Sequence, residues 1–287
     1  MDLKREAHDL SVFREAQPGF EAPGTTRSVT IGGVAIGAGG PVVIAGPCAV
    51  ESRAQTLAIA HAVQKAGARI LRGSAYKPRT NPHDFQGLGA RGLEILAEAR
   101  AETGLPFVTE VLDPRLVETV ARVADALQIG SRSMQNFPLL TEVGRAGKPV
   151  LLKRGYAATL DEWLCAAEYI AIEGNLDIVL CERGIRTFSN GLYDRATLDL
   201  GAITAVRRAV PFPILVDPSH AAGRADLVPA MALAGLAQGA HGLLVEVIEP
   251  GADREKILCD GEQGIEPEEL AELLRRAEAM WRMGSSV

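Results

Sequence analysis

Short apolar runs recur along the chain, and a stretch with helical spacing follows each of them. Eight such runs lie at residues 42–45, 69–71, 106–108, 126–129, 149–152, 177–180, 213–216 and 242–245. Their apolar residues are continuous rather than alternating, which is typical of parallel strands covered on both faces. The repeats, of roughly 20–40 residues each, predict a (β/α)8 TIM barrel. A doubly wound open sheet is the alternative, because periodicity alone does not show that a sheet closes.

Residues with capping side chains precede several predicted helices. Ser52, Asp113 and Thr159 each stand directly before a segment with helical spacing. The side-chain oxygen of such a residue accepts hydrogen bonds from the free N–H groups of the first turn. From Glu266 onward the spacing predicts a last helix with one apolar face, formed by Leu270, Leu273, Leu274, Ala277 and Trp281.

The first 40 residues precede the first predicted barrel strand. Residues 28–36 alternate around Gly32-Gly33, which predicts a β-hairpin, and we expect it to plug the floor of the barrel. Residues 1–27 have the composition of a loose arm. We therefore expect an N-terminal arm and hairpin over residues 1–40 and a catalytic barrel over residues 41–287, with no separate regulatory domain.

Composition and charge exclude several classes of protein. The chain has 287 residues with a net charge of −6 and no basic run, which argues against binding to nucleic acid or to a membrane surface. The four cysteines lie far apart without a CxxC motif, so they indicate neither a zinc finger nor a disulfide framework. The charged N-terminus lacks the apolar run of a signal peptide, and no uninterrupted apolar stretch predicts a membrane span. We expect a cytoplasmic protein.

Charged side chains gather where the predicted strands end, which is where TIM barrels carry their catalytic residues. Directly after the apolar runs stand Cys48, Arg72, Lys77, Arg79, Glu110, Arg132, Lys153, Arg183, Asp217, His220 and Glu246. Each of these residue types, taken singly, more often has a structural role. Six basic side chains on one rim of an acidic protein nevertheless indicate a substrate with several phosphate or carboxylate groups, since arginine binds these bidentately.

Four of the residues near strand ends form a mixed set of metal ligands, namely Cys48, His220, Glu246 and Asp260. One thiolate, one imidazole and two carboxylates suit a divalent first-row metal with an open position, such as manganese, iron, cobalt or zinc. The residues alone therefore predict metal-assisted chemistry on a phosphorylated small molecule. Because Cys259 adjoins Asp260, we also expect it to lie near Cys48 and to be able to form a disulfide that blocks metal binding.

Long motifs in the chain resemble those of the 3-deoxy-7-phosphoheptulonate (DAHP) synthases, in the short subfamily related to 3-deoxy-octulosonate 8-phosphate (KDO8P) synthase. The resemblance runs from about residue 28 to the last helix. The motifs that carry it are GPC at 46–48, LRGSAYKPRT at 71–80, FQGLG at 85–89, TEV at 109–111, QIGSRSMQN at 128–136, LKRG at 152–155, CERG at 181–184 and DPSH at 217–220.

The resemblance implies condensation of phosphoenolpyruvate with erythrose 4-phosphate to give DAHP and phosphate, the first step of the shikimate pathway to the aromatic amino acids. It implies a homodimer or homotetramer and a divalent metal, most often Mn²⁺ with Co²⁺, Fe²⁺ or Zn²⁺ as alternatives, on Cys48, His220, Glu246 and Asp260. The residues it assigns to phosphoenolpyruvate are Arg72, Lys77, Arg132, Lys153 and Arg183.

The substrate loop distinguishes this chain from the KDO8P synthases, whose corresponding motif reads Lys-Ala-Asn-Arg-Ser. The resemblance therefore implies that Lys77, Pro78, Arg79 and Thr80 contact erythrose 4-phosphate. Two alternatives stay open at this point. One is a KDO8P-type synthase that uses arabinose 5-phosphate, and the other is a non-catalytic barrel that binds phosphorylated ligands.

The chemistry of the reaction suggests roles for individual side chains. An enol ether carbon is a weak nucleophile, so a metal must polarise the aldehyde that it attacks. Positive charge then builds at C2 of phosphoenolpyruvate, where water adds. Glu110 is the candidate that orients or deprotonates this water, with Lys153 as a competing proton donor or acceptor. Arg132, Lys153 and Arg183 would stabilise the departing phosphate.

Overall fold

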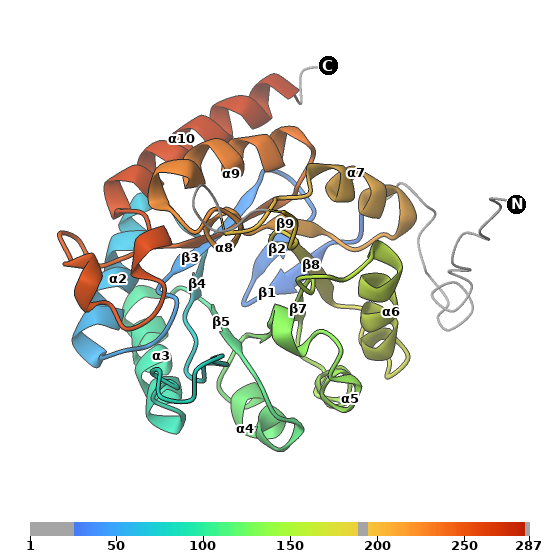
Figure 1. The fold of residues 1–287 in the computed structure, drawn as a ribbon, viewed down its shortest axis with the longest axis horizontal. Coiled ribbons are helices and arrows are strands. Elements are labelled where there is room, and N and C mark those ends of the chain that lie inside the picture. The colour runs from blue at the N-terminus through green and yellow to red at the C-terminus, as the bar shows by residue number, and fades with distance from the viewer. Residues whose placement is uncertain (1–25, 189–194, 285–287) are drawn as a thin grey trace, which may run out of the picture.

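Eight parallel strands close into a barrel surrounded by helices (Figure 1). This computed structural model describes residues 26–188 and 195–284, so residues 1–25 of the predicted arm lie outside the described residues. The strands follow one another around the barrel in chain order, and β10 pairs with both β9 and β3. The TIM-barrel prediction is confirmed, and the open-sheet alternative is wrong.

Each predicted apolar run corresponds to one barrel strand. The strands are β3 (Val42–Gly46), β4 (Ile70–Arg72), β5 (Phe107–Glu110), β6 (Ala126–Ile129), β7 (Val150–Lys153), β8 (Ile178–Glu182), β9 (Ile214–Val216) and β10 (Gly242–Glu246). Five of them end on a charged residue that the apolar pattern leaves out. The backbone of such a residue still pairs with the next strand, as Lys153 does with Cys181 and Glu246 does with Gly46. The last residue of a strand thereby carries its charge onto the rim of the barrel.

Helices follow the barrel strands, and most of them cover the outside of the barrel, whereas one short helix lies over its carboxyl end. They are α2 (Arg53–Ala66), α3 (Ala90–Thr103), α4 (Val117–Ala121), α5 (Phe137–Arg145), α6 (Leu160–Ala171), α7 (Leu200–Ala209), α8 (Pro218–Ala222), α9 (Val228–Ala237) and α10 (Pro267–Gly284). Short 3₁₀ turns are η1 (Pro114–Leu116), η2 (Ser131–Ser133), η3 (Ala225–Leu227), η4 (Arg254–Lys256) and η5 (Gly261–Gln263). None of the helices in the described segments has the length and apolarity that crossing a membrane requires.

The predicted capping residues begin helical segments as expected. Ser52 Oγ accepts a hydrogen bond from the N–H of Gln55 at 3.1 Å, and Thr159 forms a reciprocal capping box with Glu162. Asp113 accepts from the N–H of Arg115 at 2.9 Å, although it begins the 3₁₀ turn η1 rather than an α-helix. These caps set where the chain turns from each rim loop into the outer layer.

The predicted hairpin is formed by β1 (Val29–Ile31) and β2 (Val34–Ile36), which pair antiparallel. Gly32 and Gly33 turn with φ of +53° and +86°, as a tight hairpin turn requires, and a Cβ on Gly32 would lie 2.1 Å from Cβ of Pro106. The inward side chains of the hairpin pack against those of the barrel interior, including Ile44, Val108 and Leu244. The hairpin therefore plugs the floor of the barrel, as predicted, and leaves the opposite rim open.

A larger core lies between the strands and the helices and holds the rim in place. Trp163 on α6 is completely buried there, and its Nε1–H donates to the carbonyl of Leu152 at 3.3 Å. Residues facing the helices, such as Leu71 and Phe107, alternate along the strands with those that face the hairpin. Both faces of each strand are thus packed, which explains the continuous apolar runs.

Candidate active site

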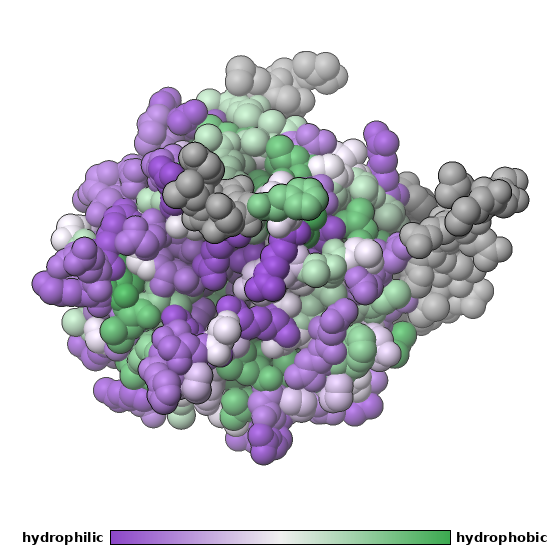
Figure 2. Space-filling model, viewed as in Figure 1, coloured by the Kyte–Doolittle hydropathy of each residue, from purple (hydrophilic) through white to green (hydrophobic). Residues whose placement is uncertain are grey.

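The six basic residues predicted at strand ends all line one cavity at the carboxyl end of the barrel, with a volume of about 130 Å³. They are joined there by Arg195, and by Glu110, Gln128, His220 and Asp260. Hydrophilic residues gather around the middle of the corresponding face of the molecule (Figure 2). The cavity carries more positive than negative groups, which suits an anionic ligand.

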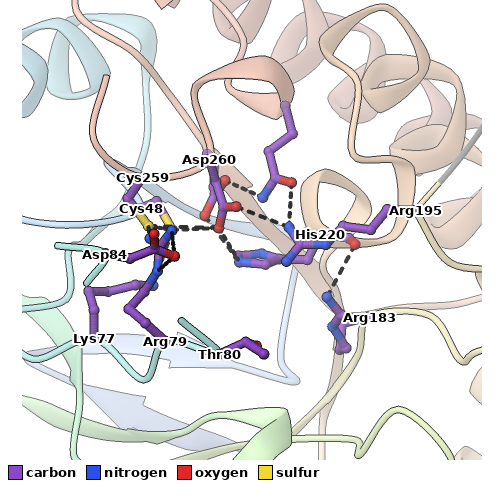
Figure 3. A network of polar contacts seen from close by, with 12 residues as sticks. Cys48, Lys77, Arg79, Thr80, Asp84, Arg183, Arg195, His220, Cys259 and Asp260 are labelled. Carbon is purple, nitrogen blue, oxygen red and sulfur yellow. Dashed lines mark hydrogen bonds and ion pairs between the residues drawn. The ribbon is translucent and has the colours of Figure 1, made fainter. Parts of the chain in front are cut away.

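The four predicted metal ligands converge beside this cavity, where His220 and Asp260 belong to its lining. Figure 3 shows Cys48, His220 and Asp260 close to one another. Cys48 follows β3, His220 lies on α8, Glu246 ends β10, and Asp260 lies in the long loop after β10. One candidate ligand atom from each residue lies within 4.8 Å of the other three. Cys48 Sγ is 3.2 Å from Asp260 Oδ2, and His220 Nε2 is 3.3 Å from Glu246 Oε1. Segments that are far apart in the sequence thus form a compact cluster of donors.

The chemistry of these donors fits a divalent metal. Burial lowers the pKa of His220 to about 4, so its imidazole is neutral at pH 7 and has a lone pair to donate. Asp217 Oδ2 lies 2.7 Å from His220 Nδ1, which leaves Nε2 facing Glu246 and Asp260. A carboxylate behind a histidine is the arrangement that orients metal-binding imidazoles. A cation would also offset the crowding of two carboxylates and a thiol.

A polar network holds the two carboxylate ligands. Arg195 Nη1 donates to Asp260 Oδ1 at 3.2 Å and to Gln263 Oε1 at 2.9 Å, and Gln263 Nε2 donates to Glu246 Oε2 at 2.5 Å. Asp260 has a φ of +56°, and within the described segments it is the one residue other than glycine with a positive φ. Its unusual backbone and these hydrogen bonds together aim its carboxylate at the cluster.

Two of the basic residues predicted for phosphoenolpyruvate contact the candidate metal ligands directly. Arg72 Nη1 lies 3.2 Å from Glu246 Oε1, and both side chains are buried. Lys77 Nζ donates to Cys48 Sγ at 3.2 Å. Burial opposes the charge of both cations, but Glu246 beside Arg72 and Cys48 beside Lys77 raise their pKa values above the ordinary ones. Both side chains therefore remain cationic within the site.

Two further basic residues predicted for phosphoenolpyruvate, Lys153 and Arg183, contact the segment that carries His220. Lys153 Nζ donates to Asp217 Oδ2 at 2.5 Å, and Arg183 Nη2 donates to the carbonyl of His220 at 3.2 Å. Although burial works against ionisation of Asp217, contacts with His220 and Lys153 lower the pKa of its carboxyl well below the ordinary value. Asp217 thus contacts both the basic residue Lys153 and the candidate metal ligand His220.

Glu110 ends β5 with its carboxylate in the cavity and is almost fully buried. It packs directly over Gly130, where an added Cβ would lie 1.9 Å from Glu110 Oε1. The absence of a side chain at position 130 therefore makes room for the carboxylate of Glu110.

The predicted sugar-phosphate residues lie in the loop after β4, and Lys77, Pro78, Arg79 and Thr80 all line the cavity. Arg79 donates to Cys259 Sγ at 3.0 Å and to Asp84 Oδ2 at 3.0 Å, while Arg132 Nη2 donates to Thr80 Oγ1 at 3.5 Å. The residues predicted for the two substrates therefore share a single cavity.

The predicted proximity of the two cysteines is confirmed. Cys259 Sγ lies 3.4 Å from Cys48 Sγ, and both side chains are buried. The contact with Cys259, then burial, then the carboxylate of Glu246 raise the pKa of the Cys48 thiol well above its ordinary value.

Several cavity or network residues are absent from the sequence-based candidates. Asp217 is among the residues predicted at strand ends, but the sequence assigns it no role. Arg195 and Gln263 stand away from the strand ends, whereas Tyr156 lies shortly after β7 but carries no charge or metal-ligating atom that would single it out. They reach the site because loops fold back over the rim, as where Arg195 N donates to the carbonyl of Ala222 at 3.0 Å.

Comparison with known proteins places the chain among enzymes of one family. Residues 16–286 match the model of the DAHP synthetase I family. The phospho-2-dehydro-3-deoxyheptonate aldolase of Thermotoga maritima is 49% identical over 247 residues, which cover 86% of this chain and 72% of the relative. A 2-dehydro-3-deoxyphosphooctonate aldolase of Geobacter sulfurreducens is 30% identical over 274 residues, covering 89% of this chain and 98% of that relative.

Solved structures agree with the sequence comparison. The crystal structure of the Thermotoga maritima DAHP synthase superimposes with a TM-score of 0.83 at 46% identity, over 89% of this chain and 73% of that chain. A truncated form of the Thermotoga maritima enzyme gives a TM-score of 0.81 at 44% identity, over 89% of this chain and 92% of that chain. The chain therefore belongs to the DAHP synthetase I family.

Proposed function

We propose that this protein catalyses the metal-dependent condensation of phosphoenolpyruvate with erythrose 4-phosphate, giving DAHP and inorganic phosphate at the start of the shikimate pathway. The observation that carries the proposal is that six predicted cations and the Cys/His/Glu/Asp cluster meet at one cavity. The higher identity to the heptonate aldolase, 49% against 30% for the octonate aldolase, favours erythrose 4-phosphate over arabinose 5-phosphate.

Cys48, His220, Glu246 and Asp260 would hold the metal, because a donor set that mixes oxygen with nitrogen and sulfur suits a divalent first-row ion. We expect Mn²⁺, the ion that the resemblance to the family implies. Co²⁺, Fe²⁺ and Zn²⁺ are the alternatives. When bound, the metal supplies Lewis acidity that makes the aldehyde carbon of the sugar phosphate more electrophilic.

Five basic residues of the cavity would bind phosphoenolpyruvate, namely Arg72, Lys77, Arg132, Lys153 and Arg183. Burial would strengthen the interactions of Arg72, Lys153 and Arg183, which are all at most 4% exposed. Lys77, Pro78, Arg79 and Thr80 would bind erythrose 4-phosphate. The contact of Arg132 with Thr80 supports this proposal, because substrates bound to these residues would lie side by side.

Water addition at C2 of phosphoenolpyruvate requires a group that holds a water molecule and takes its proton. Glu110 suits this task because its buried carboxylate lines the cavity. Among the described residues, no basic group forms an ion pair with it. Lys153 is the competing candidate, but its ammonium group contacts Asp217 at 2.5 Å. Collapse of the adduct then releases phosphate, whose charge Arg132, Lys153 and Arg183 would stabilise.

The test follows the ultraviolet absorbance of phosphoenolpyruvate with erythrose 4-phosphate, and separately with arabinose 5-phosphate. A sample treated with chelator and a sample restored with manganese are compared. Metal-dependent loss with erythrose 4-phosphate alone would support the proposal. Loss with arabinose 5-phosphate instead would establish a KDO8P-type synthase, and no loss with either sugar in folded, metal-loaded protein would favour the non-catalytic alternative.

A further inference from the structure

The ring of Tyr156 is surrounded by guanidinium groups in the wall of the cavity. Tyr156 lies in the loop between β7 and α6 and lines the cavity. The Cζ atoms of Arg183, Arg186 and Arg132 lie 4.5, 5.3 and 5.5 Å from the centroid of its ring. All three distances are within the range of a cation–π interaction.

The three arginines come from different parts of the chain. Arg132 lies on η2 after β6, whereas Arg183 and Arg186 follow β8. The backbone N–H of Arg186 donates to the carbonyl of Tyr156 at 2.7 Å, so the loops after β7 and β8 are joined beside the ring. Tyr156 thus occupies the point where three neighbouring rim segments meet.

Arg183, which is buried, and Arg132, which is exposed, differ from Arg72 and Lys153 in how their charge is compensated. Arg72 and Lys153 each face a carboxylate, at 3.2 and 2.5 Å. Arg183 instead donates to the carbonyls of Gly184 and His220, and Arg132 to the hydroxyl of Thr80. In the segments that the structure describes, no carboxylate lies within ion-pair distance of either guanidinium, and the ring of Tyr156 is their shared neighbour.

We infer that Tyr156 is a positioning residue that holds Arg132 and Arg183 ready for the phosphate of phosphoenolpyruvate. The negative face of the ring attracts both guanidinium groups and offsets their mutual repulsion. A carboxylate in the same place would do this more strongly, but it would neutralise the arginines and repel the phosphate. An uncharged ring leaves the positive potential available. The ligand identity rests on the proposed function, whereas the geometry of the arginines does not.

The test measures binding to the metal-loaded protein by calorimetry, with phosphoenolpyruvate and with inorganic phosphate, in the absence of any sugar. In Tyr156→Leu both dissociation constants should rise about tenfold, the change expected when one cation–π contact to a buried guanidinium group and one to an exposed guanidinium group are lost. Tyr156→Phe keeps the ring and should recover the affinity. In steady-state kinetics KM for phosphoenolpyruvate should follow the dissociation constant, while kcat changes by less than about threefold.

The matched control is Tyr169→Leu, since Tyr169 is a partly exposed tyrosine of α6 that stacks on Phe137 rather than on the arginines. It should leave both dissociation constants unchanged. Tyr156→Met replaces the leucine variant if the latter does not fold. Wild-type affinity in the non-aromatic variant, or equal losses in the phenylalanine and leucine variants, would overturn the inference. Weakened phosphate binding in a protein that turns over neither sugar would support the inference while contradicting the proposed function.

Discussion

Lys153 and His220 contact the same carboxylate oxygen. Oδ2 of Asp217 lies 2.5 Å from Lys153 Nζ and 2.7 Å from His220 Nδ1, and the Asp217 side chain is completely buried. Its other oxygen accepts from the backbone N–H of His220 at 2.9 Å. One carboxylate therefore orients a residue proposed to bind phosphoenolpyruvate and a residue proposed to bind the metal.

Replacing Asp217 with Asn should weaken metal binding about ten- to a hundredfold, because the amide supports the imidazole of His220 less strongly than a carboxylate does. It should also lower kcat, since Lys153 loses its buried counter-charge. Competition with a metal-sensitive dye measures the affinity for Mn²⁺. Asp226→Asn is the control, because Asp226 pairs with exposed Arg224 on the surface. Unchanged Mn²⁺ affinity in Asp217→Asn would contradict the assignment.

Gly130→Ala is a steric probe of Glu110. The added methyl group would displace the carboxylate from its present position, and we expect kcat to fall at least about tenfold, with Glu110→Gln losing about 10² or more. The backbone tolerates alanine, since Gly130 has a φ of −72°, so the free energy of unfolding should change by less than about 1 kcal/mol. Kinetics and denaturant unfolding are measured together. Full activity in Gly130→Ala would exclude a catalytic role that depends on this position of Glu110.

Mild oxidation should inactivate the enzyme by joining Cys48 to Cys259. Hydrogen peroxide would take two hydrogens from the thiols to form one disulfide and two waters, and the sulfur atoms need to move only from 3.4 Å to about 2 Å. The disulfide removes a metal ligand, so Mn²⁺ binding should be lost and then restored by dithiothreitol. Cys259→Ser, which leaves Cys48 without its partner, should show no reversible loss. Persistent activation by manganese, with both thiols shown to be oxidised, would contradict this prediction.

The stability of the fold should decrease below about pH 6.5. Burial, and then the charge of Arg207, lower the pKa of His241 to about 4, whereas an unfolded histidine titrates near 6.5. Between these values the unfolded chain binds one more proton at this residue, so the free energy of unfolding falls as the pH falls. The slope from His241 is at most about 1.4 kcal/mol per pH unit.

His241→Asn tests this pH dependence. Nδ1 of His241 accepts from the N–H of Ile214 at 3.1 Å, and the asparagine oxygen can take over that bond without titrating. Denaturant unfolding from pH 7 to pH 4.5 should give a shallower slope for the variant. Equal slopes in variant and wild type would assign the acid sensitivity to other groups.

The elements of the fold follow from local patterns in the chain. Continuous apolar runs predict all eight barrel strands, and the Gly32-Gly33 turn predicts the hairpin, because both depend on neighbouring residues. The ends of the strands are less predictable. Arg72 and Lys153 interrupt the apolar pattern, yet their backbones complete the ladders. Strand pairing requires backbone hydrogen bonds rather than apolar side chains.

The rim residues could be predicted because a closed parallel barrel brings the carboxyl end of every strand to one face. That rule alone predicts that Cys48, Glu110 and Glu246, which come from distant segments, lie on the same rim. It does not place Arg195 or Gln263, which lie in loops whose paths depend on contacts such as that of Arg195 with Ala222. It places Tyr156 on the rim after β7 but does not show that this ring meets the arginines.

The sequence by itself thus determined the barrel, its plug and the chemistry of its rim, since periodicity and strand order are properties of the chain. Only the tertiary structure decided which rim side chains touch. The shared oxygen of Asp217, the carboxylate of Glu110 over Gly130 and the arginines around Tyr156 all arise from hydrogen bonds and packing between loops. Such contacts join residues that are remote in sequence, so no local pattern contains them.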